Sequence, residues 1–176
     1  LHYYHPSLIQ AVGGLYNPNT ANSKHLGDRQ VDNGQFDHDI SSKIDYPVGA
    51  SLFVSIDYIR DVGLMCEDYF LYFEELDWIL RGKAQGWDIG YCWKAKIYHK
   101  EGATIGSNSK GAKKSLLSDF YGLRNKILFT SKHFPNKSKA VKLSYVAVIV
   151  NRLLRKQYRT IPFILKMIFA KQEELK

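Results

Sequence analysis

The sequence predicts an α/β protein in which a partial mixed sheet with flanking helices is followed by an α-helical C-terminal extension. Two observations predict this class. Short β-type runs and amphipathic helical patterns are mixed between residues 47 and 99, and helical patterns alone follow. We therefore expect two domains, residues 1–111 and residues 112–176.

The N-terminal third is dominated by turn-forming residues. Residues 1–45 are rich in Gly, Asn, Asp, Ser and His, which predicts a short strand around Leu8–Val12 and then a long, mostly irregular loop. Ala50–Ser55 is apolar enough for a buried strand. Asp57–Val62 has the pattern of a short helix, and Gly63 is placed to end it.

A second helix and two β-type runs complete the first part. The helix is predicted over Glu74–Gln85 with Gly86 as its stop, because four apolar residues share one helical face: Leu76, Ile79, Leu80 and Ala84. Asp88–Trp93 and Lys96–His99 are rich in aromatic and β-branched residues, which favour strands.

The C-terminal part is predicted to be helical. Gly102–Gly111 has the small, polar composition of a loop, and helices are expected over about 113–133, 138–157 and 161–172. No apolar run approaches the roughly 20 residues that span a bilayer. Apolar residues alternate with basic ones, as in helices that lie in a membrane interface. The alternative is ordinary amphipathic helices packed on the rest of the protein.

The formal net charge of +8 is unevenly distributed. Residues 1–100 hold 9 Lys and Arg against 13 Asp and Glu, whereas residues 101–176 hold 16 against 4. This second part favours an anionic partner, such as a phospholipid surface, a phosphorylated substrate or a nucleic acid. It lacks a recognisable nucleic-acid motif, so we expect no nucleic-acid partner.

Three acids lie in an aromatic segment, Phe70–Trp78. Carboxylates are seldom buried without a partner or a metal, so Glu74, Glu75 and Asp77 are candidates for proton transfer or cation binding. Glu74 and Asp77 are three residues apart and share a helical face. The alternative is that all three begin a helix, where negative charge suits the helix dipole.

Two further candidates depend on weaker patterns. His99 follows a β-type run and precedes a loop, a place where a divalent metal could bind, although a surface histidine is the alternative. Gly49, Ala50 and Ser51 are small residues at the entry to the predicted strand. They would let the backbone approach a ligand, or they form a tight turn.

Taken in order, these motifs resemble the family 2 glycosyltransferases, especially bacterial rhamnosyltransferase-like members. The resemblance covers Gly13 to about Phe134. It is carried by Pro47-x-Gly49-Ala50-Ser51, Val62-Gly63-Leu64, the run from Tyr69 to Asp77, Gly86, the run to His99, Gly102-Ala103 and Tyr121-x-x-Arg124-Asn125.

The resemblance implies a GT-A fold and transfer of a sugar, with inversion, from a nucleotide-diphosphate donor to an acceptor hydroxyl. It implies that Glu75 is the base, with Glu in place of the family's Asp and with Glu74 and Asp77 as rivals. It places Gly49, Ala50 and Ser51 near the sugars and Arg124 near phosphate. It also implies a divalent metal, Mg²⁺ or Mn²⁺, and it matches His99 to a histidine that binds this metal or the diphosphate in some members.

The family carries its nucleotide-binding half, with an Asp-x-Asp metal motif, before the segment seen here. Asp37-His38-Asp39 has the letters but lies after the place where that motif belongs. The resemblance therefore implies that the chain is the C-terminal, acceptor-side half of the catalytic domain plus a helical extension, and that it is inactive alone.

The expected partners are a nucleotide-sugar donor, a saccharide or lipid-linked acceptor, and an anionic membrane surface that the C-terminal helices contact. Such a protein would act in cell-surface polysaccharide synthesis, in the cytoplasm at the inner face of the cell membrane. The alternative is a non-catalytic basic module that binds an anionic membrane or a polyanion.

Overall fold

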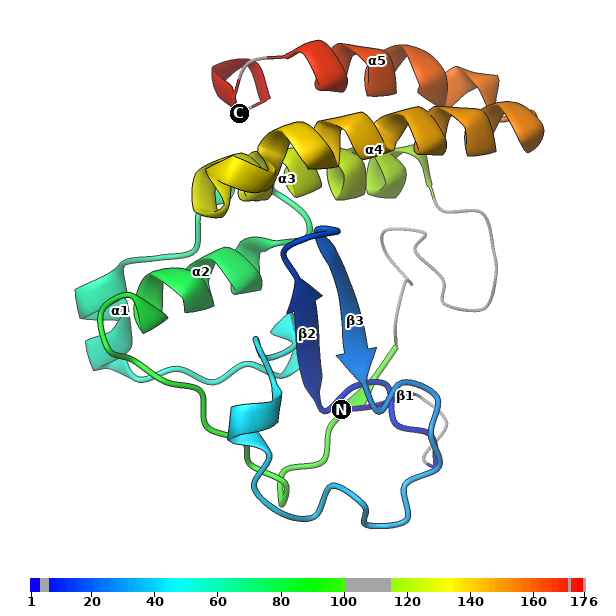
Figure 1. Ribbon diagram of the computed structural model, residues 1–176. Coiled ribbons are helices and arrows are strands. Elements are labelled where there is room, and N and C mark those ends of the chain that lie inside the picture. The colour runs from blue at the N-terminus through cyan, green and yellow to red at the C-terminus, as the bar shows by residue number, and fades with distance from the viewer. Residues whose placement is uncertain (4–6, 101–114, 171, 176) are drawn as a thin grey trace. The chain divides into compact units, whose positions relative to one another are not determined.

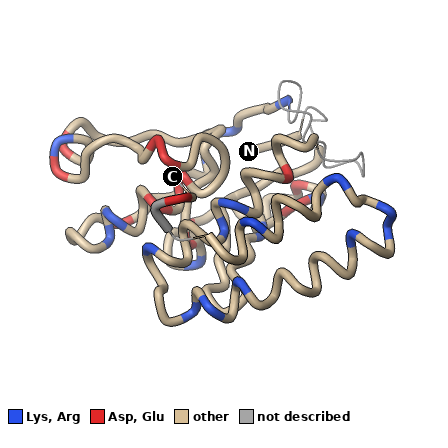
Figure 2. The backbone as a smooth tube through the Cα atoms, turned by 90° about the horizontal axis from the view of Figure 1, so that it is seen from above, with Lys and Arg blue, Asp and Glu red and all other residues tan. Residues whose placement is uncertain are grey.

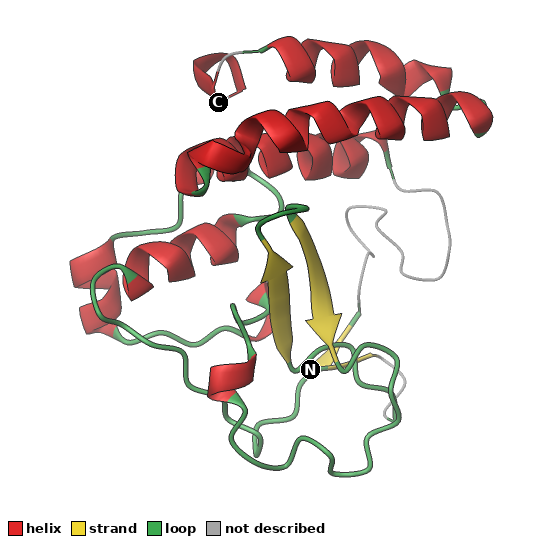
Figure 3. Ribbon diagram, in the orientation of Figure 1, coloured by secondary structure: helices red, strands yellow, loops and turns green. Residues whose placement is uncertain are grey.

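The computed structural model describes residues 1–3, 7–100, 115–170 and 172–175. The chain divides into two compact units. The first comprises Leu1–Tyr16, Ser23–Glu67 and Glu74–Ala103, and the second comprises Asn17–Asn22, Asp68–Phe73 and Thr104–Lys176. Over the described residues there are five α-helices and two small sheets, which confirms the α/β class. Strands lie in the first part of the chain and the long helices in the second (Figure 3).

The strands are short and paired two by two. β1 (His2–Tyr3) runs parallel to β4 (Tyr98–His99), with His2 opposite Tyr98. β2 (Gly13–Asn17) and β3 (Asn22–Leu26) form a hairpin (Figure 1). The strand predicted over residues 8–12 is wrong, because that segment makes only isolated bridges.

Glycine explains why the strand begins at residue 13. A Cβ at Gly13 would lie 2.9 Å from Cβ of Ile44, and a Cβ at Gly14 would overlap the ring of Tyr46. The Gly14 N–H donates to the carbonyl of Tyr46 at 2.8 Å. Gly13 and Gly14 thus let residues 44–46 pack directly on an extended backbone.

Both helices predicted in the first unit are confirmed. α1 spans Ile56–Val62, is capped by the Ser55 hydroxyl, which accepts from the Tyr58 N–H at 3.1 Å, and ends at Gly63 with φ of 80°. α2 spans Glu74–Lys83, two residues shorter than predicted. The buried residues Tyr58, Val62 and Trp78 form a core between these helices. The Tyr58 hydroxyl donates to the Trp78 carbonyl at 2.7 Å.

The other predicted β-type runs are mostly not strands. Gly49–Ser51 forms a 3-10 turn, and residues 52–55 carry no strand assignment, so the buried strand over 50–55 is wrong. Phe53 is 97% exposed. Neither of the two described sheets includes this apolar run. Residues 88–93 are likewise irregular, and only Tyr98–His99 of the next run is paired.

The described residues of the second unit form three α-helices: α3 (Leu116–His133), α4 (Pro135–Leu154) and α5 (Ile161–Phe169). α4 contacts both α3 and α5, and the three lie side by side in Figure 1. The buried Tyr145 of α4 donates its hydroxyl to the Leu123 carbonyl of α3 at 2.6 Å. Arg152 of α4 pairs with Asp119 of α3 at 2.6 Å.

The three C-terminal helices are confirmed, with different bounds. α3 ends at His133, two residues before Pro135, and Pro135 is the first residue of α4, a position that proline suits. The loop predicted over Gly102–Gly111 lies outside the described residues. Within the described part of the chain, no helix is long and apolar enough to cross a bilayer.

Candidate active site

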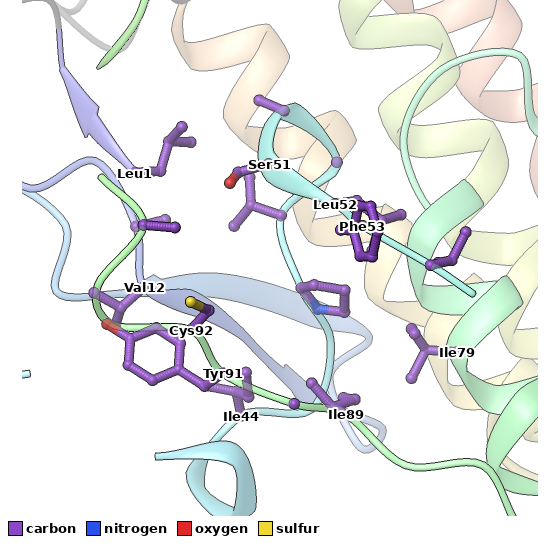
Figure 4. A pocket seen from close by; sticks show the side chains of 18 of the residues that line it. Leu1, Val12, Ile44, Ser51, Leu52, Phe53, Ile79, Ile89, Tyr91 and Cys92 are labelled. Carbon is purple, nitrogen blue, oxygen red and sulfur yellow. The ribbon is translucent and has the colours of Figure 1, made fainter. Parts of the chain in front are cut away.

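The first unit contains a cavity of about 840 Å³, within the range of small-molecule sites. Three of the predicted substrate-binding residues, Gly49, Ala50 and Ser51, line it through their 3-10 turn. In Figure 4 this turn lies on one side, and Tyr91 and Cys92 lie on another. Most of the remaining lining is apolar: Val12, Ile44, Leu52, Phe53, Ile79, Trp87, Ile89 and Ile97. The aromatic lining residues were not predicted, since nothing local in their sequence marks them.

Glu75 of α2 lies directly against Gly49. A Cβ at Gly49 would overlap the Oε1 atom of Glu75 and would lie 2.9 Å from its Cδ. Any residue with a Cβ at position 49 would therefore displace this carboxylate from its place beside the cavity-lining Gly49. The negative charge of Glu75 also reaches Tyr46: burial is the main cause that raises the pKa of the Tyr46 hydroxyl, and Glu75 adds to it. Tyr46 is a neighbour that the sequence did not indicate.

Glu74 is half-buried at the first position of α2. The pKa of its carboxyl is raised to about 7, mainly by burial; a backbone hydrogen bond opposes the rise, and the neighbouring charge of Glu75 adds to it. A carboxyl group that titrates near neutral pH can exchange protons with a substrate under physiological conditions. Glu74 and Glu75 thus form an adjacent pair with different environments.

Asp77 has a structural role. Its side chain is 0% exposed and accepts from Nε of Arg81 at 2.9 Å. Arg81 also donates to the carbonyls of Val62 at 2.6 Å and Leu64 at 2.7 Å, so the ion pair fixes α2 to the segment that follows α1. A carboxylate held in this way is not available to a substrate. We therefore remove Asp77 from the candidate bases.

Arg124 lies in the second unit, on α3, and is 7% exposed. Its Nη1 donates to the carbonyl of Asp68 at 2.7 Å and to Oδ1 of Asn125 at 2.8 Å. The guanidinium is thus used inside the protein. The predicted contact with phosphate has no support from this geometry.

Asn125 is a residue that the site prediction missed. Its buried amide donates to the carbonyls of Tyr69 at 2.7 Å, Leu71 at 2.7 Å and Tyr72 at 3.1 Å. These bonds hold the segment in which Phe70, Tyr72 and Phe73 have positive φ, of 60°, 69° and 75°. Such strain needs external support. The signal was visible as a polar pair, Arg124-Asn125, in an apolar stretch of helix.

His99, the predicted metal ligand, lies at the end of β4 with its Nδ1 3.1 Å from Oε1 of Gln10. Among the residues that the structure describes, no three His, Cys, Asp or Glu side chains are grouped to hold a metal ion. The described side chains around His99 therefore do not by themselves fit a Mg²⁺ or Mn²⁺ site, which needs several oxygen ligands.

The structure thus unites part of the predicted site. Gly49, Ala50 and Ser51 line the cavity. Glu75 is not one of its lining residues, but its carboxylate contacts Gly49, and Glu74 precedes it in the chain. Comparisons of the chain with protein-family models, with curated proteins and with solved structures gave no match in any of the three.

Proposed function

We propose that this chain forms the acceptor-side part of an inverting glycosyltransferase that uses a nucleotide-diphosphate sugar. One observation carries the proposal: a glutamate carboxylate lies on a glycine that lines a cavity large enough for a sugar. The order of motifs that resembles family 2 glycosyltransferases supports the same assignment. The GT-A fold is part of this proposal.

In the proposed reaction Glu75 accepts the proton of the acceptor hydroxyl. The freed oxygen lone pair forms a bond to the anomeric carbon of the donor sugar. The bond between that carbon and the diphosphate oxygen breaks, and its electron pair leaves with the nucleoside diphosphate. Attack from the opposite face inverts the anomeric configuration. The base is expected to contribute about 100-fold or more to the rate.

Glu74 is the rival base, since its raised pKa suits proton transfer near neutral pH. We assign the base to Glu75 because its carboxylate, and not that of Glu74, is the one placed against Gly49. In this assignment Glu74 keeps its proton at slightly acid pH, which limits negative charge beside Glu75.

A divalent metal would offset charge on the leaving diphosphate. Since the side chains around His99 do not fit such an ion, we assign no step of the reaction to a metal.

The test is a transfer assay on the whole protein that carries this sequence, with a panel of nucleotide-diphosphate sugars and release of nucleoside diphosphate as the readout. Glu75→Gln should lower turnover at least about 100-fold. Glu67→Gln is the matched control, because Glu67 is exposed and outside the cavity. Unchanged turnover in Glu75→Gln would refute the assignment of the base, and transfer of no sugar by the unmodified protein would refute the function.

A second candidate is a non-catalytic basic module, which the basic C-terminal helices favour. Residues 120–172 contain twelve Lys and Arg and no Asp or Glu. Glu75→Lys distinguishes the two functions. It should abolish transfer if the protein is the proposed enzyme, while polyanion binding through the C-terminal helices should be nearly unchanged in either case.

A further inference from the structure

α4 has an apolar face on its outer side as well as on its inner side. Val141 and Tyr145 are buried in the second unit. Five aliphatic side chains of the same helix are between 47% and 80% exposed: Leu143, Val146, Val150, Leu153 and Leu154. At 100° per residue they fall within an arc of about 100°, on the side opposite Val141 and Tyr145. We call these five residues the outer stripe.

Exposed aliphatic residues grouped in this way usually mark a surface that contacts another body. The charges around the stripe indicate which kind. Lys137 and Lys139 are exposed near its beginning, and Arg155, Lys156 and Arg159 are exposed just beyond its end. Figure 2 shows Lys and Arg along these helices. Because residues 120–172 hold no acid, nothing on α4 or α5 offsets this positive charge.

A second copy of the chain is a poor occupant. If two outer stripes paired, parallel or antiparallel, the basic ends of one helix would meet the basic ends of the other. Such like-charge contacts oppose association. A nucleic acid is also poorly matched, since single strands are bound through stacking aromatic side chains and the stripe is wholly aliphatic.

We propose that the outer stripe docks in the interface of an anionic lipid bilayer. The five aliphatic side chains would enter the boundary between headgroups and acyl chains, and the basic residues at both ends would contact lipid phosphates. This arrangement removes the apolar surface from water and at the same time pairs the basic residues with lipid phosphates. It does not depend on the glycosyltransferase proposal, because it uses residues of α4 and its ends alone.

Co-sedimentation of the 176-residue chain with lipid vesicles tests the proposal. We expect binding to phosphatidylcholine vesicles that contain about 30% phosphatidylglycerol, and at least tenfold weaker binding to phosphatidylcholine alone. Raising salt from about 50 mM to about 500 mM should weaken the binding at least tenfold, because screening reduces the attraction.

Two pairs of variants test the two parts of the surface. Leu143→Gln with Leu154→Gln removes apolar area and should weaken binding at least tenfold, whereas Leu64→Gln, at 74% exposure in the first unit, should not change it. Lys139→Glu with Arg155→Glu should weaken binding about 25-fold or more, since each basic residue contributes roughly fivefold. The matched control is Lys24→Glu with Lys43→Glu, two exposed residues of the first unit. Circular dichroism confirms that each variant is folded.

Several results would overturn the proposal. They are equal binding to neutral and anionic vesicles, no binding to either, or binding that Leu143→Gln with Leu154→Gln leaves unchanged. Stronger binding to heparin or RNA than to anionic vesicles would favour a polyanion. A dimer in sedimentation velocity that the same two leucine substitutions disperse would instead make the stripe an interface between copies.

Discussion

The Glu75 carboxylate lies directly against Gly49. It occupies the space where any other residue at position 49 would carry its Cβ. One residue begins a helix and the other forms a 3-10 turn at the cavity. The Glu75 carboxylate can hold this position because residue 49 is a glycine.

Gly49→Ala should therefore displace the Glu75 side chain. We expect transfer to fall at least tenfold, because misplaced catalytic groups lose the benefit of orientation. Stability should change by less than about 1 kcal/mol, since the displaced group is a half-exposed side chain. Gly90→Ala is the control: Gly90 lines the same cavity and has open space where a Cβ would lie. Equal activity of the two variants would show that the Glu75 position does not matter.

Glu74 should make stability depend on pH. Its pKa is raised from 4.5 to about 7, so the folded chain holds this proton more tightly than the unfolded chain. The contribution of Glu74 to the free energy of unfolding is fully present below about pH 4.5 and is lost as pH rises through 7. The loss should not exceed about 2 kcal/mol, because water screens a half-exposed group.

Glu74→Gln should remove this loss, so that the variant gains stability relative to the unmodified chain as pH rises from 4.5 to 8. Urea unfolding at several pH values measures the difference. The contributions of the other titrating groups cancel in this difference, because both proteins carry the same groups. A difference that is constant with pH would contradict the raised pKa.

Asp77 and Arg81 form a buried ion pair on α2, whereas Asp57 and Arg60 form an exposed pair on α1 at 3.1 Å. Asp77→Ala removes the fully buried carboxylate that the partly buried Arg81 guanidinium pairs with, and it should lower the free energy of unfolding by about 3 kcal/mol. Asp57→Ala should lower it by less than about 0.5 kcal/mol. Chemical denaturation compares the two, and similar losses would show that Asp77 is not structurally special.

The fold was predictable where local signals determined it. Ser55 and Gly63 cap α1, and the periodicity of α2 to α5 is visible in the chain. The strand over residues 50–55 failed because an apolar run becomes a strand only when a partner pairs with it. The Asp77 pair could have been found, since Arg81 follows it by four residues.

Long-range relations decided the rest. The contact of Glu75 with Gly49 joins segments that are far apart in the sequence, so no spacing rule predicts it. The family resemblance places Arg124 near phosphate, but the Asp68 carbonyl and the Asn125 side chain that it contacts in the fold cannot be read from that resemblance. The same holds for Asn125, whose three acceptors lie in a turn that precedes α2.

Asn125→Ala should destabilise the protein by about 3 kcal/mol, because it removes the amide that bonds three carbonyls and supports a turn with three positive φ values. Asn136→Ala, at an exposed position of α4, should cost less than about 0.5 kcal/mol. Thermal unfolding of both variants checks this. A loss of stability in Asn125→Ala as small as that in the control would mean that the turn keeps its conformation without the Asn125 side chain.

The most direct measurement is the rate of sugar transfer by Glu75→Asp beside Glu75→Gln in the whole protein that carries this sequence. A base needs a carboxylate, so we predict that Glu75→Asp retains at least about a tenth of the activity while Glu75→Gln loses about 100-fold or more. Equal rates in the two variants, whether both active or both inactive, would contradict proton abstraction by Glu75.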